Sequence, residues 1–214
     1  MRRIVIVVAV VVALLVVLDR VAVVAADRVV AARIQTQEHL QSRPSVSIGG
    51  FPFLTQALGG KYDDVTLTVH DFHRSVVPVD TISVTLHGVH VPLGSVFSQH
   101  LSSVPVDSAN ARVLLTYANL NAYLQPKGIT VSAAGVARLR VTGSVTVGGQ
   151  KLSASGTATI DVTSDSLLLR AANAVSIAVP LAGLPFGIAL QSAKATKQGI
   201  AVTATAQGLV LHPR

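Results

Sequence analysis

The amino-acid sequence predicts an α+β protein, in which one N-terminal helix precedes a curved, mostly antiparallel sheet that carries a few short helices. Three observations lead to this fold class. Residues 4–18 form an unbroken apolar segment. From residue 45 onward, apolar and polar residues alternate with the period of two that a half-buried strand requires. The 214 residues leave room for one sizeable domain after the apolar segment.

The N-terminal segment predicts a helix that either spans a membrane or acts as a signal peptide. Fifteen apolar residues follow Met1-Arg2-Arg3, and Asp19-Arg20 separates them from a second apolar stretch, Val21–Ala26. A helix over residues 4–26 is about 34 Å long, which exceeds the ~30 Å hydrocarbon core, whereas residues 4–18 cover only about 22 Å. Val24-Ala25-Ala26 is equally a small-residue cleavage site. Both outcomes stay open at this point.

An uncleaved anchor is favoured over a signal peptide because the helical pattern continues through residues 27–42 and ends only before Pro44. Asp19 and Arg20 then lie near the outer end of the membrane helix. There, side chains that extend toward the water lower the free-energy cost of placing charges in the membrane. Arg2 and Arg3 stay on the cytoplasmic side, so the rest faces the extracytoplasmic side of the cell membrane. The predicted organisation is an anchor or signal helix with its extension, 1–43, and a β-rich domain, 44–214.

The first strands of the domain show a clear apolar face. Val65, Leu67 and Val69 alternate with polar residues, and the stretch from Ile82 to Leu86 repeats the pattern. This alternation is typical of half-buried antiparallel sheet. The phase changes at Gly88, where a glycine indicates a bulge or bend.

A long hairpin is predicted from residues 136–147 and 152–162, with Gly148-Gly149-Gln150 as the turn. Residues 186–194 and 200–211 form a last pair that turns at 196–199, and residues 53–58 and 117–124 read as short helices. Together these strands predict one long meandering sheet. Its apolar face holds several small residues, which leave volume for an acyl chain or let a facing layer approach closely. These small residues are Gly143, Ala154, Gly156, Ala158 and Ala204.

No motif in the sequence predicts catalysis, a metal site or a cofactor. The chain has no Cys, which excludes disulfides, thiolate metal sites and a cysteine nucleophile. Nucleophile-elbow, P-loop, dinucleotide and zinc-protease motifs are absent. Asp63-Asp64 is not a catalytic dyad because neighbours on a strand face opposite ways. His70, His73, His87 and His90 form two H-x-x-H pairs, of which His70 and His87 share a face only if their strands are neighbours.

The charge of the chain is compatible with an anionic partner. The net charge is +7, of which +4 belongs to residues 44–214. Such a surplus suits an anionic membrane surface or lipid headgroups, and it also occurs on ordinary solvated surfaces. Arg138, Arg140 and Lys151 are expected near each other on the polar side of the hairpin, either solvated or in contact with phosphate. The basic residues lack interleaved aromatics, so nucleic acid is not expected as a partner.

Two glycine-bounded motifs carry a resemblance to a known family. The first is Gly50–Val65, which reads GFPFLTQALGGKYDDV, and the second is Leu184–Gly187, which reads LPFG. The terminal segment Gly199–Ala206 adds to the resemblance. With the Arg-flanked anchor and the Tyr117–Leu120 segment, they resemble the LmeA-type phospholipid-binding family of actinobacteria. The resemblance implies a tubular lipid-binding fold and a periplasmic cell-envelope protein that binds anionic phospholipids such as phosphoinositides. It also implies support of lipomannan elongation, and it carries over no catalytic residue.

Together these features predict a non-enzymatic lipid-binding or lipid-transfer protein in which acyl chains contact the apolar sheet and cations meet the headgroup. The alternative is an envelope scaffold that stabilises a membrane glycosyltransferase. The expected acyl-contacting residues are Phe51, Phe53, Leu54, Leu139, Val141, Val145, Leu152, Ile160 and Phe186. The expected headgroup residues are Lys61, Arg138, Arg140 and Lys151. Phe51, Phe53 and Leu54 either plug the end of the sheet or dip into a membrane.

Overall fold

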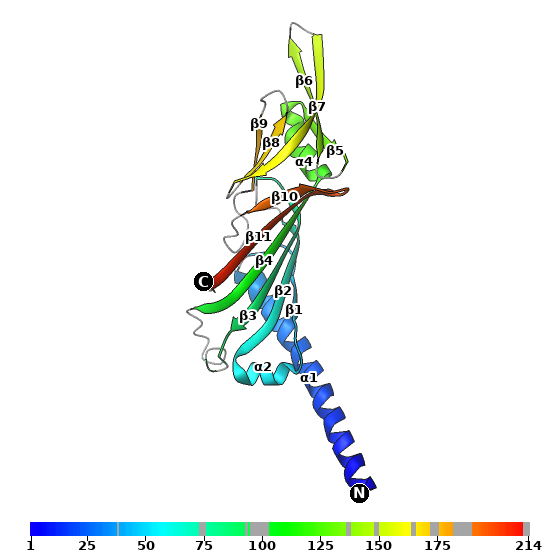
Figure 1. The fold of residues 1–214 in the computed structure, drawn as a ribbon, viewed down its shortest axis with the longest axis vertical. Coiled ribbons are helices and arrows are strands. Elements are labelled where there is room, and N and C mark those ends of the chain that lie inside the picture. The colour runs from blue at the N-terminus through cyan, green and yellow to red at the C-terminus, as the bar shows by residue number, and fades with distance from the viewer. Residues whose placement is uncertain are drawn as a thin grey trace. The chain divides into compact units, whose positions relative to one another are not determined.

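The structure is a computed structural model that describes residues 1–37, 39–72, 76–92, 94, 103–135, 138–147, 150–163, 166–171, 176–181 and 190–211. It confirms the α+β class, with one long N-terminal helix, short helices and antiparallel strand pairs (Figure 1). The strands form two sheets of six and five strands, where the sequence predicted one long sheet. Two compact units are present: unit 1 comprises Met1–Thr68, Val84–Ala109 and Ala206–Arg214, and unit 2 comprises Val69–Ser83 and Asn110–Thr205.

Helix α1, Arg2–Gln37, belongs to unit 1 and is long and apolar enough to cross a membrane. It continues past Ala26 as predicted, although it ends at Gln37 and not near residue 42. Its second half packs against strand β1, Ser45–Ile48, and helix α2, Phe53–Gly59. Three residues of α1 are buried: Asp19, Val23 and Ala31. The helix is therefore partly a component of the folded unit and not wholly a separate segment.

The six-stranded sheet is curled and has the order β1-β2-β3-β4-β11-β10 (Figure 1). Its other strands are β2, Lys61–Phe72; β3, Val79–His90; β4, Val104–Thr116; β10, Ser192–Ala195; and β11, Gly199–Leu211. Strands β2, β3, β4 and β11 each contribute residues to both units. Buried side chains along β3 change phase as predicted, from Ile82 and Val84 to Val89. Gly88 makes this change with a φ of 61°, a backbone conformation that glycine adopts without a steric penalty.

Unit 2 contains the five-stranded antiparallel sheet, in the order β5-β6-β7-β8-β9. Its strands are β5, Ile129–Ala133; β6, Leu139–Val147; β7, Gln150–Val162; β8, Ser166–Ala171; and β9, Ser176–Pro180. Helix α4, Tyr117–Leu124, matches its predicted bounds, packs against β5 and is followed by the 3-10 turn η1, Gln125–Lys127. The fully buried leucines of this unit form its core: Leu115, Leu120, Leu124, Leu139, Leu167, Leu169 and Leu181.

The two predicted hairpins are present with shifted ends. Val147 pairs with Gln150, so Gln150 is a strand residue and not part of the turn. The last hairpin begins at Ser192 within the described chain, and the Thr196 hydroxyl closes its turn by donating to the Gly199 carbonyl at 2.8 Å. The predicted strand residues 136–137 and 186–189 and the predicted turn residues 148–149 lie outside the described residues. Cross-strand pairs such as Leu139 with Ala158 confirm that the apolar faces of β6 and β7 coincide.

Candidate functional site

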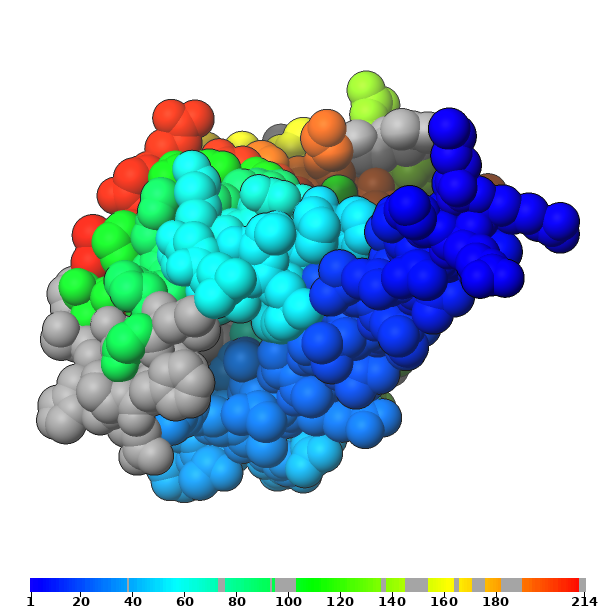
Figure 2. Space-filling model, turned by 90° about the horizontal axis from the view of Figure 1, so that it is seen from below, coloured from blue at the N-terminus to red at the C-terminus, as the bar shows by residue number. Residues whose placement is uncertain are grey.

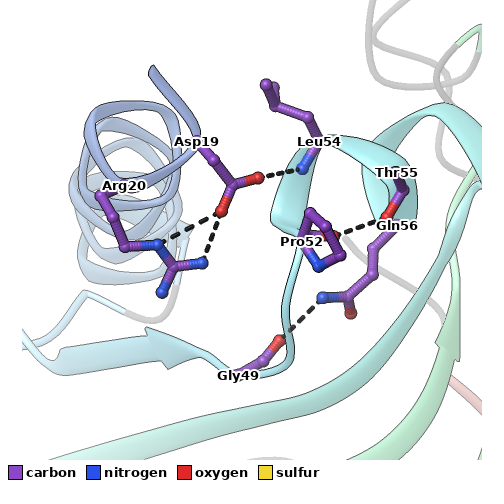
Figure 3. A network of polar contacts seen from close by, with 7 residues as sticks. All are labelled: Asp19, Arg20, Gly49, Pro52, Leu54, Thr55 and Gln56. Atoms are coloured by element: carbon purple, nitrogen blue, oxygen red, sulfur yellow. Dashed lines mark hydrogen bonds and ion pairs between the residues drawn. The ribbon is translucent and has the colours of Figure 1, made fainter. Parts of the chain in front are cut away.

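The junction of α1 and α2 is organised around one buried carboxylate (Figure 3). Asp19 is 2% exposed, and its Oδ1 accepts the Leu54 N–H at 2.8 Å. Its Oδ2 lies 2.5 Å from Arg20 Nη2. Helix α2 has Pro52 at its N-cap, with no side-chain cap of its own. The first-turn N–H groups of a helix need acceptors, so the carboxylate of a distant helix performs the capping role for α2.

The GFPFLTQ motif holds α2 between two strands. Gln56 Nε2 donates to the Gly49 carbonyl at 3.2 Å, and Gln56 Oε1 accepts the Asp63 N–H at 2.8 Å. Gly50 has a φ of 88°, and a Cβ there would overlap the Gln56 side chain. On the other side of the motif, Asp27 Oδ1 accepts the Ile48 N–H at 2.9 Å. The turn between β1 and α2 is thereby fixed by side chains from α1 and from α2 itself.

The two phenylalanines of the motif have opposite environments. Phe53 is 7% exposed, and its ring centroid lies 6.1 Å from that of Tyr62. Phe51 is 61% exposed, and the guanidinium carbon of Arg20 lies 5.1 Å from its ring centroid. Leu54 is half-buried. The plug interpretation therefore fits Phe53, whereas Phe51 faces outward.

Tyr62 connects α2 to a small apolar cluster of unit 1. The cluster consists of Val89, Val104 and Val106, and half-buried apolar side chains pack around it. These are Tyr62, Val65, Leu86, Val91, Leu209 and Leu211. Burial also raises the pKa of the Tyr62 phenol. Apolar and aromatic side chains of this kind line most ligand pockets in proteins.

An open groove of about 510 Å³ lies over this cluster. Its lining comes from the ends of three strands of unit 1: His90 of β3; Pro105, Val106 and Asp107 of β4; and Gly208, Leu209 and Val210 of β11. Val106 is 2% exposed and forms the floor, while Val210 remains 50% exposed. The groove thus combines aliphatic walls with two ionisable side chains.

A carboxylate between a lysine and a histidine marks the rim of the groove. Asp107 Oδ1 lies 3.0 Å from His90 Nε2, and Asp107 Oδ2 lies 3.3 Å from Lys61 Nζ. The hydrogen bonds from His90 and then from Lys61 hold the pKa of Asp107 below its ordinary value. A lowered carboxyl pKa stabilises the fold above the unfolded-state value of about 3.9, and this contribution is lost as the pH falls through the folded-state pKa. Asp107 is therefore ionised at neutral pH.

Replacing Gly88 with alanine is expected to disturb this rim. Its φ of 61° is left-handed, and a Cβ there would overlap the Asp107 carboxylate. The left-handed backbone alone costs a residue with a Cβ roughly 1–2 kcal/mol. Urea denaturation of Gly88→Ala measures the loss. Gly143→Ala is the matched control, because a Cβ at Gly143 meets nothing within 4 Å; equal stability of the two variants would contradict the assigned role of Gly88.

The structure does not gather the four predicted headgroup residues. Lys61 belongs to unit 1, at the groove rim, and the other three belong to unit 2. Arg138 and Arg140 are exposed, as expected for the polar side of the hairpin. Arg140 pairs with Thr157, whereas Lys151 pairs with Thr146. Six strand residues separate these positions, roughly 20 Å, so the predicted proximity of Lys151 to the two arginines is wrong.

The predicted acyl-contacting residues of unit 2 differ in burial. Leu139 is fully buried within the core, and Val141 and Ile160 are half-buried. The side chains of Val145 and Leu152 and the whole of Phe186 lie outside the described part of the chain. Their contact with lipid stays a prediction. Sequence periodicity missed the groove of unit 1, because its residues come from strands far apart in the chain.

The histidines have separate partners. His70 Nδ1 lies 3.4 Å from the Thr81 hydroxyl, whereas His87 bonds to the Asp64 carboxylate. Asp64 therefore has a specific partner on the neighbouring strand. His73 lies outside the described residues. Across those described residues, no three His, Asp or Glu side chains are grouped as metal ligands.

The chain matches the model of LmeA-like phospholipid-binding proteins over residues 17–205. The chain belongs to the LmeA-like phospholipid-binding family. Searches of curated proteins and of solved structures gave no match. The LmeA-like region begins two residues before Asp19, so it includes the carboxylate that caps α2. The family description is one of binding and names no reaction.

Proposed function

We propose that this LmeA-like protein binds an anionic phospholipid, such as a phosphoinositide, in the groove of unit 1. The acyl chain lies along Val106 and Leu209, and the headgroup phosphate meets Lys61 and His90. The observation that carries the proposal is an apolar groove whose rim holds one carboxylate bonded to a lysine and a histidine side chain. The function is binding or transfer of lipid, without a chemical step.

The size and lining of the groove suit one part of a lipid molecule. Its volume of about 510 Å³ lies within the 300–1,000 Å³ of typical ligand sites. Each methylene removed from water contributes ~0.8 kcal/mol, so a few methylenes supply the affinity. Charge on the rim then selects the headgroup, because a phosphate competes with Asp107 for Lys61 and His90.

The protein acts at the extracytoplasmic face of the cell membrane, to which α1 anchors it. Arg2 and Arg3 precede the apolar segment and keep the N-terminus on the cytoplasmic side. A role in supplying or sensing lipid for envelope lipoglycan synthesis is proposed from the family resemblance alone. This proposed role does not specify a partner enzyme.

The rim is tested by two substitutions with opposite expected effects. Lys61→Ala removes a cation and is expected to weaken binding to phosphatidylinositol-containing vesicles by about twofold to fivefold, the range of an exposed ion pair. Asp107→Asn removes the competing carboxylate and is expected to strengthen binding by a similar factor. Vesicle co-sedimentation and native mass spectrometry of co-purified lipid measure both effects.

The control for the rim is Lys194→Ala. Lys194 is an exposed cation of β10 that does not line the groove, so its loss reports only general charge attraction. Equal weakening by Lys61→Ala and Lys194→Ala, together with no gain from Asp107→Asn, would contradict a headgroup site at the rim. Absence of any co-purified lipid from the unmodified protein would contradict the proposed function as a whole.

A further inference from the structure

The first buried residue of α1 is Asp19, directly after the uninterrupted apolar segment of residues 4–18. Every large apolar side chain from Ile4 to Leu18 is between 39% and 68% exposed. The next residue, Asp19, is 2% exposed and bonded to α2. From Asp19 onward one side of α1 is buried at Asp19, Val23 and Ala31, whereas Val21, Val24 and Val29 stay exposed on the rest of its surface.

The length of this exposed segment matches the hydrocarbon core of a membrane. Arg3 and Arg20 enclose it, and seventeen helical steps between them correspond to roughly 26 Å. With both arginines extended toward water, such a segment crosses a core of ~30 Å. The outer boundary of the hydrocarbon therefore lies within about one helical turn of Arg20.

Helix α2 is held at the same level as Arg20. Asp19 Oδ1 bonds to the Leu54 N–H at 2.8 Å, and the Arg20 guanidinium carbon lies 5.1 Å from the Phe51 ring centroid. Within unit 1, the view from below shows α2 directly beside α1 (Figure 2). The position of α2 along α1 is thus set by the residues that end the membrane-spanning segment.

The α2 segment presents two large apolar side chains to the outside. Phe51 is 61% exposed and Leu58 is 78% exposed. Exposed aromatic and aliphatic side chains beside a membrane-length helix and an arginine are typical of residues at the lipid interface. Water is an unfavourable environment for both side chains.

We propose that Phe51 and Leu58 insert into the outer leaflet from which α1 emerges, so that α2 is the membrane-contact element of the domain. The Arg20 side chain lies at the phosphate level of that leaflet. Cleavage after Ala26 would separate α2 from this position, so the proposal requires α1 to be retained.

Single tryptophans report this contact directly, because the chain contains no Trp. The full chain is reconstituted in vesicles of phosphatidylcholine, with and without bromine on the acyl chains, and Phe51→Trp and Leu58→Trp are compared. Val12→Trp is the reference within the membrane segment. Val29→Trp is the matched control on the same helix, since Val29 is 66% exposed and nine residues, roughly 14 Å, beyond Arg20.

Tryptophans at positions 51 and 58 are expected to show blue-shifted emission and strong quenching by brominated lipid, as at position 12, whereas position 29 is not quenched. Emission from positions 51 and 58 that matches position 29 would overturn the proposal. The contact does not depend on the groove: adding Leu209→Asp to Phe51→Trp is expected to leave the quenching unchanged. Loss of quenching in that double variant would also overturn an independent membrane contact by α2.

Discussion

A chain that begins at Asp27 is expected to melt about 5–10 °C below one that begins at Val17. The shorter chain lacks Asp19, the acceptor for the Leu54 N–H, and Val23, which is 7% exposed. Burial of a valine contributes ~1.5–3 kcal/mol, and 1 kcal/mol shifts the midpoint of a domain of this size by roughly 2–4 °C. Loss of the α2 cap adds to that effect. Thermal unfolding followed by circular dichroism measures the difference.

The chain that begins at Val17 is the control, because it removes only exposed membrane-segment residues and keeps the whole LmeA-like match. It is expected to melt like the full chain in detergent. Equal melting of all three chains would mean that residues 17–26 of α1 contribute nothing to the stability of the fold. If α1 is retained as an anchor, mass spectrometry of the protein isolated from native membranes is expected to detect peptides that include Asp19 and Arg20. A mature N-terminus at Asp27 would contradict retention of the helix.

Replacing Leu209 with aspartate is expected to reduce phospholipid binding at least tenfold. Leu209 lines the groove and packs against the cluster of Val89, Val104 and Val106. The substitution removes most of the ~1.5–3 kcal/mol that a covered leucine contributes and places a negative charge beside the acyl chain. Each 1.4 kcal/mol is a factor of ten in affinity. Native mass spectrometry and vesicle co-sedimentation measure the loss.

Val76→Asp is the matched control for this substitution. Val76 is 59% exposed and is not part of the groove, so the variant carries the same new charge at a site that lipid does not cover. Lipid binding equal to that of the unmodified chain is expected for Val76→Asp. If Leu209→Asp binds lipid equally well while both variants remain folded, the groove is not the binding site.

Local periodicity was sufficient for much of the secondary structure. Alternation predicted the strands on both sides of Gly88, and the pattern of Tyr117–Leu124 predicted α4 with its observed ends. In α4, local chemistry also fixes the start, since the Thr116 hydroxyl accepts the Asn119 N–H at 3.3 Å. Such signals involve residues only a few positions apart, so they can be recognised in the sequence without knowledge of the fold.

Local sequence patterns did not predict the pairing register of strands β6 and β7. Arg140 and Lys151 both lie on the predicted polar side, yet the pairing of β6 with β7 places Lys151 opposite Thr146 and Arg140 opposite Thr157. Alternation assigns the face of a residue but not its position along the neighbouring strand, because every second residue satisfies the same pattern. The prediction of three neighbouring cations therefore failed in the spacing along the strands.

The sequence by itself determined the α+β class, the membrane-length helix, the short helices and the apolar faces of the strands, because each depends on neighbours along the chain. Only the tertiary structure decided the groove, with Lys61 and His90 on one Asp107 carboxylate, and the use of Asp19 to cap α2. Lys61 and Asp107 are 46 positions apart, and Asp19 and Leu54 are 35 apart. Contacts over such separations depend on which strands and helices pack together, and that choice has no local periodic signal.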